Sequence, residues 1–336
     1  MSPRLIHFGR DQLLWECTEK AAAEICPSGF PNGIAGVDIK REMIFLAPNY
    51  NRVISNQAPK SYYAWERIVR EYSDTQLTKI TDKLVALSGL AKRMKVILDD
   101  DYVAGMWRHA LPEQLFWTSR YQWHRSPISY GDISRRSATY VAPTWSWASA
   151  IHAVMFGVAT IQKVEVQVVD IYLDHFSEDP TGAITSGYLD LKGWLRPVSF
   201  LRIAEAENAT SWVRWQITSC EDLEDDYWKG AENFESLVFF DDDQRRHEAE
   251  TKTKSFYCML GGSRNDQLHI TLMCLLLEMV DQVQGVYERV GMATIKCERD
   301  PEGTIEDTLN RFKAPVTGTA IPCRCYSEGG YTIRIR

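Results

Sequence analysis

The period of the hydrophobic pattern changes near residue 158, and this change limits the possible folds more than any other feature of the chain. Between Trp65 and Tyr72, apolar residues recur at spacings of three and four, which is typical of one face of a helix. Between Val164 and Val168, apolar and polar residues alternate, which is typical of a strand with one solvated face. The pattern therefore predicts helices first and strands afterwards.

Several elements can be placed before residue 155. Residues 4–8 and 11–17 are β-prone runs around Gly9-Arg10 and predict a β-hairpin. Two helices are predicted from Lys60 and from Ile80, the second behind Thr78 as a possible cap, and a short third helix is predicted from Leu111. Strand-like runs then follow at residues 188–195, 211–217, 237–240, 256–260, 269–280, 286–295 and 331–335.

We therefore expect an α+β fold. Its N-terminal half, residues 1–155, should be α-rich and include the hairpin, while residues 156–336 should form a mostly antiparallel β sandwich or barrel. No linker is long enough to separate the two halves, so they are expected to pack as one compact unit.

Composition excludes several classes of partner. A 45% hydrophobic content allows a sizeable core, and a net charge of -7 without a basic run disfavours nucleic acid. No segment approaches the roughly 18 uncharged apolar residues of a membrane span, and the N-terminus has no apolar run of signal-peptide length. We expect a cytoplasmic protein that binds neither nucleic acid nor membrane.

The sequence lacks the motifs typical of metalloproteases, serine hydrolases and nucleotide-binding loops. There is no His-Glu-x-x-His, no serine elbow and no P-loop lysine. The acidic runs at residues 99–101 and 241–243 are interpreted as solvated caps and charged connections rather than metal sites, and Cys323-Arg324-Cys325 lacks zinc spacing. The eight cysteines are expected to be buried free thiols. We predict no cofactor and no metal, and neither cleavage nor tight binding of NAD.

Tryptophan next to small polar or acidic residues marks a candidate site. Trp145 and Trp147 are two residues apart, so on a strand they would share a face, either in the core or on a pocket wall. A convergence on one aromatic cavity is predicted for the binding residues Trp15, Trp107, Trp117, Trp145, Ser146 and Trp147. If the chain is catalytic, Glu16 and His109 are the candidates for proton transfer.

Four sequence blocks resemble one fungal family. The run from Tyr140 to Ser149, YVAPTWSWAS, is similar to the APSWSWAS block that lies downstream of the effector domain in many heterokaryon-incompatibility (HET) proteins. The other blocks lie in residues 2–17, 101–117 and 275–291, in the same order. The resemblance implies the region downstream of a cell-death effector domain, whose own hallmarks are expected upstream and are not present here.

Two functions remain open from the sequence. The first is a HET-like recognition or regulatory module without its effector domain, binding a small apolar ligand or a protein partner. The alternative is a cofactor-independent enzyme, such as an isomerase or cyclase of secondary metabolism, that acts on a small apolar substrate in an aromatic pocket.

Overall fold

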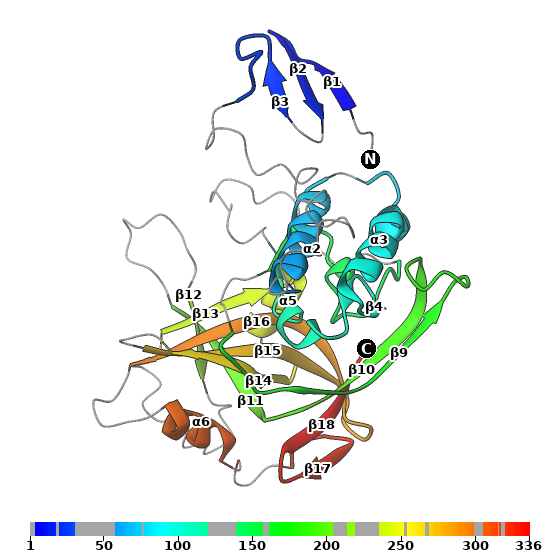
Figure 1. Ribbon diagram of the computed structural model, residues 1–336. Helices are drawn as coiled ribbons and strands as arrows, with labels where there is room; N and C mark the ends of the chain where they lie inside the picture. Colours follow the sequence, from blue (N-terminus) through cyan, green and yellow to red (C-terminus); the bar gives the residue numbers. More distant parts are fainter. Residues whose placement is uncertain are drawn as a thin grey trace.

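The protein is mostly β, as the computed structural model in Figure 1 shows. The structure describes residues 4–17, 20–30, 58–75, 77–119, 139–156, 161–203, 214–218, 235–251, 254–265, 269–298, 305–314, 316 and 320–336. Strands make up 44% and helices 22%, so the predicted α-rich N-terminal half is wrong. The helical spacing before residue 155 does correspond to helices, but these are short and are separated by turns and small strands.

The chain begins with a small antiparallel sheet. Strands β1 (Arg4–Phe8) and β2 (Leu13–Cys17) form the predicted hairpin, and β3 (Ala21–Ala23) adds a third strand beside β2. The turn needs Gly9, because a Cβ atom there would lie 2.8 Å from the main-chain oxygen of Gln12.

The helical spacing found in the sequence produces two main helices. Helix α2 (Ala58–Ser73) buries Trp65 and Val69, both 0% exposed. Helix α3 (Ser88–Leu98) begins later than predicted, because two 3-10 turns, η2 (Ile80–Asp82) and η3 (Val85–Leu87), precede it. Short elements follow: β4 (Tyr102–Val103), β5 (Met106–Trp107), α4 (Leu111–Gln114), β6 (Thr118–Ser119) and β7 (Val154–Met155). The start of α4 at Leu111 confirms that prediction.

An 11-stranded sheet forms the rest of the framework, with order β12-β11-β14-β15-β16-β18-β10-β9 and with β13, β17 and β8 at its sides. Its strands are β8 (Lys163–Val164), β9 (Gln167–His175), β10 (Ile184–Gly193), β11 (Leu195–Ile203), β12 (Arg214–Thr218), β13 (Glu235–Phe240), β14 (Phe256–Asn265), β15 (His269–Asp281), β16 (Val286–Glu298), β17 (Cys325–Ser327) and β18 (Gly330–Ile335). All described pairs in it are antiparallel except β16 with β18.

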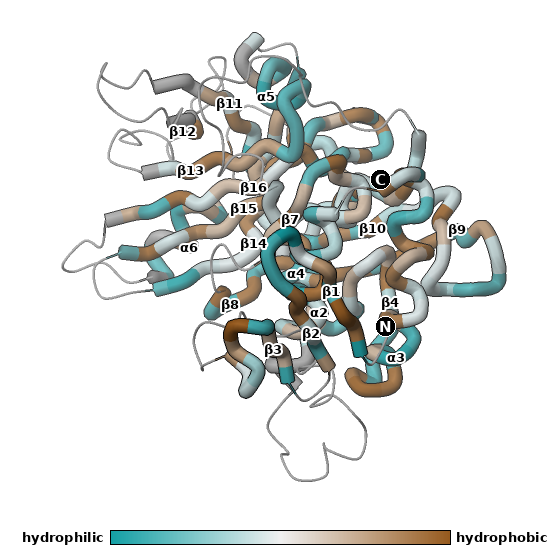
Figure 2. Tube along the Cα trace, turned by 90° about the horizontal axis from the view of Figure 1, so that it is seen from above, coloured by the Kyte–Doolittle hydropathy of each residue, from teal (hydrophilic) through white to brown (hydrophobic). Residues whose placement is uncertain are grey.

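The central strands are buried on both faces. In β15, Met273 and Leu275 face one hydrophobic cluster, which also contains the tryptophans of the N-terminal helices and loops, while Leu272 and Cys274 face a second cluster. This division follows from the two-residue period of a strand. Helix α6 (Ile305–Lys313) contributes to the second cluster, and Figure 2 shows β14, β15 and β16 side by side within the sheet.

The acidic run at residues 241–243 is buried, contrary to the prediction of a solvated connection. These residues begin helix α5 (Asp243–Glu250), where Asp242 accepts a hydrogen bond from the Arg245 main-chain nitrogen at 2.9 Å. Asp241 forms an ion pair with buried Arg289 of β16. Burial is tolerated because capping and ion pairing replace the lost hydration. No group of three metal-ligating side chains occurs among the described residues.

Cysteine burial follows the sheet. The thiols of Cys258, Cys274 and Cys297 are free and buried on β14, β15 and β16, as expected for all eight cysteines. Cys325 is exposed, and Cys17, Cys26 and Cys323 are half-buried, so the expectation is wrong for these four; Cys220 lies outside the described residues. In the described part of the chain, no helix is both long and apolar enough to cross a membrane.

Candidate functional site

The tryptophan block folds as a turn and a 3-10 helix, η5 (Trp147–Ser149), rather than as the predicted strand. The main-chain nitrogen of Ser146 donates to the Pro143 oxygen at 2.9 Å, which closes the turn. The Ser146 hydroxyl then accepts from the Ala148 nitrogen at 3.0 Å and donates to the Ala104 oxygen at 2.6 Å. A proline-led turn with a serine cap thus replaces strand pairing.

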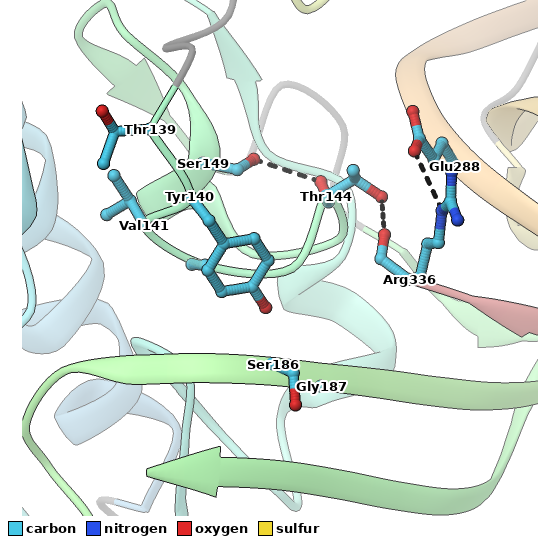
Figure 3. A pocket seen from close by; sticks show the side chains of 10 residues that line it. Thr139, Tyr140, Val141, Thr144, Ser149, Ser186, Gly187, Glu288 and Arg336 are labelled. Atoms are coloured by element: carbon cyan, nitrogen blue, oxygen red, sulfur yellow. Dashed lines mark hydrogen bonds and ion pairs between the residues drawn. The ribbon is translucent and has the colours of Figure 1, made fainter. Parts of the chain in front are cut away.

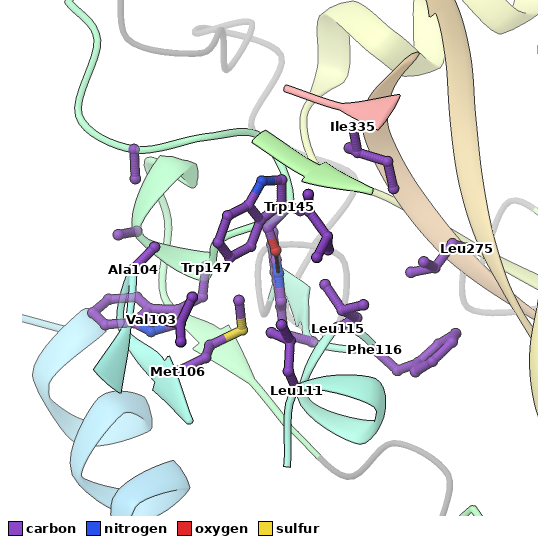
Figure 4. Close-up of a cluster of buried hydrophobic side chains, with 14 of the residues drawn as sticks. Val103, Ala104, Met106, Leu111, Leu115, Phe116, Trp145, Trp147, Leu275 and Ile335 are labelled. Atoms are coloured by element: carbon purple, nitrogen blue, oxygen red, sulfur yellow. Dashed lines mark hydrogen bonds between the residues drawn. The ribbon is translucent and has the colours of Figure 1, made fainter. Parts of the chain in front are cut away.

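The structure brings four of the predicted binding tryptophans together in the core. Trp107, Trp117, Trp145 and Trp147 are each 0% exposed and belong to one hydrophobic cluster, part of which Figure 4 shows around Trp145 and Trp147. Ser146 is also 0% exposed. Their predicted role in binding stays a prediction, because the structure places them among packed side chains.

The indole N–H groups divide into two kinds. Trp117 Nε1 donates to the Trp145 oxygen at 3.0 Å, and Trp147 Nε1 donates to the Gly105 oxygen at 2.8 Å. For Trp107 and Trp145, the structure describes no hydrogen-bond partner of Nε1. Backbone oxygens therefore bind part of this cluster. Its rings also pack edge to face, as Trp65 does against Trp107 with ring centroids 5.4 Å apart.

Trp15 and Glu16 do not join this cluster. Both lie on β2 of the small N-terminal sheet, where Trp15 is 38% exposed and Glu16 lies 3.4 Å from His7 Nε2. Trp15 pairs with Ile6 of β1 and Ala22 of β3, so its pairing partners come from the small N-terminal sheet.

His109 is held by a buried carboxylate that the sequence had suggested was solvated. The His109 Nδ1 atom lies 2.7 Å from Asp100 Oδ1, and Tyr62 donates its hydroxyl to Asp100 Oδ2 at 2.9 Å. The Asp100 side chain is 0% exposed and the His109 side chain is 74% exposed. Asp100 thus holds the exposed imidazole of His109 at the surface, and the predicted role of His109 in proton transfer stays a prediction.

Glu66 of α2 lies near this pair and was not identified from the sequence. Its burial is the main cause that raises its pKa to about 7, with a smaller contribution from Glu113. Gln114 Nε2 approaches Glu66 Oε1 at 3.5 Å. Because the folded pKa lies above the unfolded value of 4.5, the contribution of Glu66 to stability is fully present below about pH 4.5 and is lost as the pH rises through about 7.

Glu66→Gln is therefore expected to leave the free energy of unfolding nearly unchanged at pH 4 and to raise it by about 1–3 kcal/mol at pH 8. Urea unfolding at the two pH values measures the difference. The exposed Glu71→Gln serves as the control for loss of one charge from the same helix. An equal effect of Glu66→Gln at both pH values would contradict the assignment.

A pocket of about 400 Å³ lies on the outer side of the tryptophan block. Residues 139–142, Thr144 and Ser149 form one wall, and Ser186 and Gly187 of β10 form the other. Figure 3 shows the ring of Tyr140 above the strand that carries these two residues. Gly187 permits the close approach, because a Cβ atom there would lie 3.1 Å from Pro143 Cγ and 2.7 Å from Leu173 Cδ2.

Two charged residues complete the pocket. Glu288 of β16 and Arg336 form an ion pair, with Arg336 Nε 3.1 Å from Glu288 Oε1. Thr144 fastens the wall to the end of β18, because its main-chain nitrogen donates to the Arg336 oxygen at 3.0 Å. Its hydroxyl oxygen accepts from the Arg289 main-chain nitrogen at 3.0 Å. The pocket is therefore attached directly to the buried core.

Of the pocket residues, the sequence had singled out those of the block that contains Tyr140, Thr144 and Ser149, and Glu288 within the block at residues 275–291. Ser186 and Arg336 carry no local motif, and sequence reasoning missed both. The one local signal beside the tryptophans is Pro143, since proline within a strand-like run favours a strand edge or entrance. The pocket lining includes neither His109 nor Glu16.

Fold and site together define a mostly β protein with one wall of a small-molecule-sized pocket built from its tryptophan block. Comparison with protein-family models, with curated proteins and with solved structures finds no match to this chain.

Proposed function

We propose that this chain is a HET-like recognition or regulatory module that binds a small molecule in the pocket between residues 139–149 and β10. The pocket itself is the observation that carries the proposal. Its volume of about 400 Å³ lies within the roughly 300–1,000 Å³ of ligand sites. The block that most resembles HET proteins forms one wall of it.

The chemistry of the lining favours binding over catalysis. Val141 and Ala142 are apolar, and Thr144, Ser149 and Ser186 offer hydroxyls. The Thr144 and Ser149 hydroxyls already bind main-chain oxygens, so their geometry is preset. A preorganised apolar wall with a few polar groups suits recognition of a ligand without chemical change.

N-phenyl-1-naphthylamine, a neutral apolar fluorophore, tests this proposal. It is expected to bind the chain at one saturable site, with enhanced emission. Ser186→Trp, which fills the pocket from an exposed position, should weaken this binding by about tenfold or more.

Val169→Trp provides the matched control, because Val169 is 52% exposed on the neighbouring strand β9 and lies outside the pocket lining. This variant should bind the fluorophore as the parent chain does. Absence of saturable binding, or equal binding by both tryptophan variants and the parent, would overturn the proposal.

A further inference from the structure

We infer that the ligand of this pocket is a small amphipathic acid, whose apolar body fills the space beside Tyr140 and whose anionic group binds the guanidinium of Arg336. This inference rests on the proposed function and adds the chemical class of the ligand. Arg336 supplies the one cationic side chain of the lining, at the end of the pocket opposite residues 139–142.

The guanidinium of Arg336 has N–H donors that are available to a ligand. Its Nε atom binds Glu288, and no contact of its two terminal nitrogens is seen within the described residues. The side chain is 56% exposed, so a ligand can reach it. A guanidinium presents five N–H donors in a planar fork that matches a carboxylate, which leaves four here.

Arg334 of β18, two residues before Arg336, shows the contrast. Arg334 places Nε and Nη2 each 2.8 Å from the Asp190 carboxylate, and its guanidinium lies 3.3 Å from the Tyr188 ring centroid. Its Nε and Nη2 donors bind Asp190, and its guanidinium packs against the Tyr188 ring. Arg334 is therefore a structural cation, whereas Arg336 is available to a ligand.

Glu288 does not depend on Arg336 for its charge compensation. Its Oε2 atom lies 2.7 Å from Nη2 of Arg245, which also pairs with Glu278 and Glu248. When an incoming acid takes the terminal nitrogens of Arg336, Glu288 keeps its second partner. The ion pair with Glu288 thus orients the guanidinium of Arg336 at the pocket and leaves its two terminal nitrogens available to a ligand.

The rest of the lining favours a neutral, apolar body. Val141 and Ala142 are buried, and the half-exposed ring of Tyr140 offers a flat surface for stacking. Partial burial raises the pKa of Tyr140 to about 12, so its hydroxyl stays protonated at neutral pH and does not repel an anion.

A pair of fluorophores separates the acid from the apolar body. 8-Anilinonaphthalene-1-sulfonate carries the same fused and phenyl rings as N-phenyl-1-naphthylamine and adds one sulfonate. We expect the parent chain to bind the sulfonate about 5- to 10-fold more tightly than the neutral compound in low salt. Arg336→Gln should reduce that ratio to about one, because it removes the cation that binds the sulfonate.

Arg108→Gln, which neutralises a half-exposed arginine outside the lining, should preserve the ratio. Equal affinity of the two compounds in the parent chain, or an unchanged ratio in Arg336→Gln, would overturn the assignment of an acid while leaving the pocket itself intact. Failure of both compounds to bind, or binding that Ser186→Trp leaves unchanged, would instead overturn the proposed function.

Discussion

Arg289→Met is expected to lower the free energy of unfolding by about 3–5 kcal/mol, because it removes the arginine that forms an ion pair with buried Asp241. The Arg289 side chain is 0% exposed, and its Nη1 atom lies 2.6 Å from Asp241 Oδ2. Its Nη2 atom donates to the Trp117 oxygen, and the guanidinium lies 3.6 Å from the Trp117 ring centroid. One side chain thus joins β16, the start of α5 and the tryptophan cluster. Urea or guanidinium unfolding measures the loss.

The double variant Arg289→Met/Asp241→Leu distinguishes the effect of the ion pair on stability from the effect of the packing around it. Replacing both charges by apolar side chains removes the uncompensated carboxylate, so a large part of the lost stability should return. A single Arg289→Met variant within about 1 kcal/mol of the parent would contradict the role of the pair. Equal losses in the single and double variants would assign the effect to shape rather than to charge.

Gly105→Ala is expected to lower the free energy of unfolding by about 2–5 kcal/mol, because backbone strain and overpacking add together. Gly105 has a φ of 92°, where side chains other than glycine are strained. An added Cβ atom would lie 2.5 Å from Trp147 Nε1 and 2.9 Å from its Cε2 atom. The Gly105 oxygen also accepts from Trp65 Nε1 at 2.9 Å and from Trp147 Nε1 at 2.8 Å, so displacement would disturb two indoles. Chemical unfolding followed by tryptophan fluorescence reports both effects.

Gly89→Ala is the matched control for the same chemical change. Gly89 lies in α3, and beyond its chain neighbours and the adjacent helix backbone no atom lies within 4 Å of an added Cβ there. Alanine has a higher helix propensity than glycine, so the free energy of unfolding of this variant should rise by about 0.5–1 kcal/mol. A loss at Gly105 no larger than about 0.5 kcal/mol would show that the loop moves aside without cost.

Local elements were predictable wherever neighbours in sequence decide the conformation. The hairpin at β1 and β2, the apolar face of α2 and the start of α4 at Leu111 all follow from spacing, turn residues and proline placement. The alternation between Val164 and Val168 falls on the end of β8, two residues outside the strands and the start of β9, so it indicated strand structure but not the bounds of the strands. The amount of helix was overestimated, because helical spacing between Ile80 and Leu87 produces 3-10 turns that only the later α3 continues.

The sequence by itself determined the N-terminal hairpin, the apolar face of α2 and the start of α4, because neighbours in sequence decide these conformations. Tertiary structure alone decided that Trp145 and Trp147 lie in a turn and η5, where Ser146 binds the oxygen of Ala104, 42 residues away. It also decided the pocket, because its walls meet through strand pairing and through contacts such as Thr144 with Arg336, 192 residues apart. Burial of a charge depends on partners that the fold brings from elsewhere, and no local pattern specifies them.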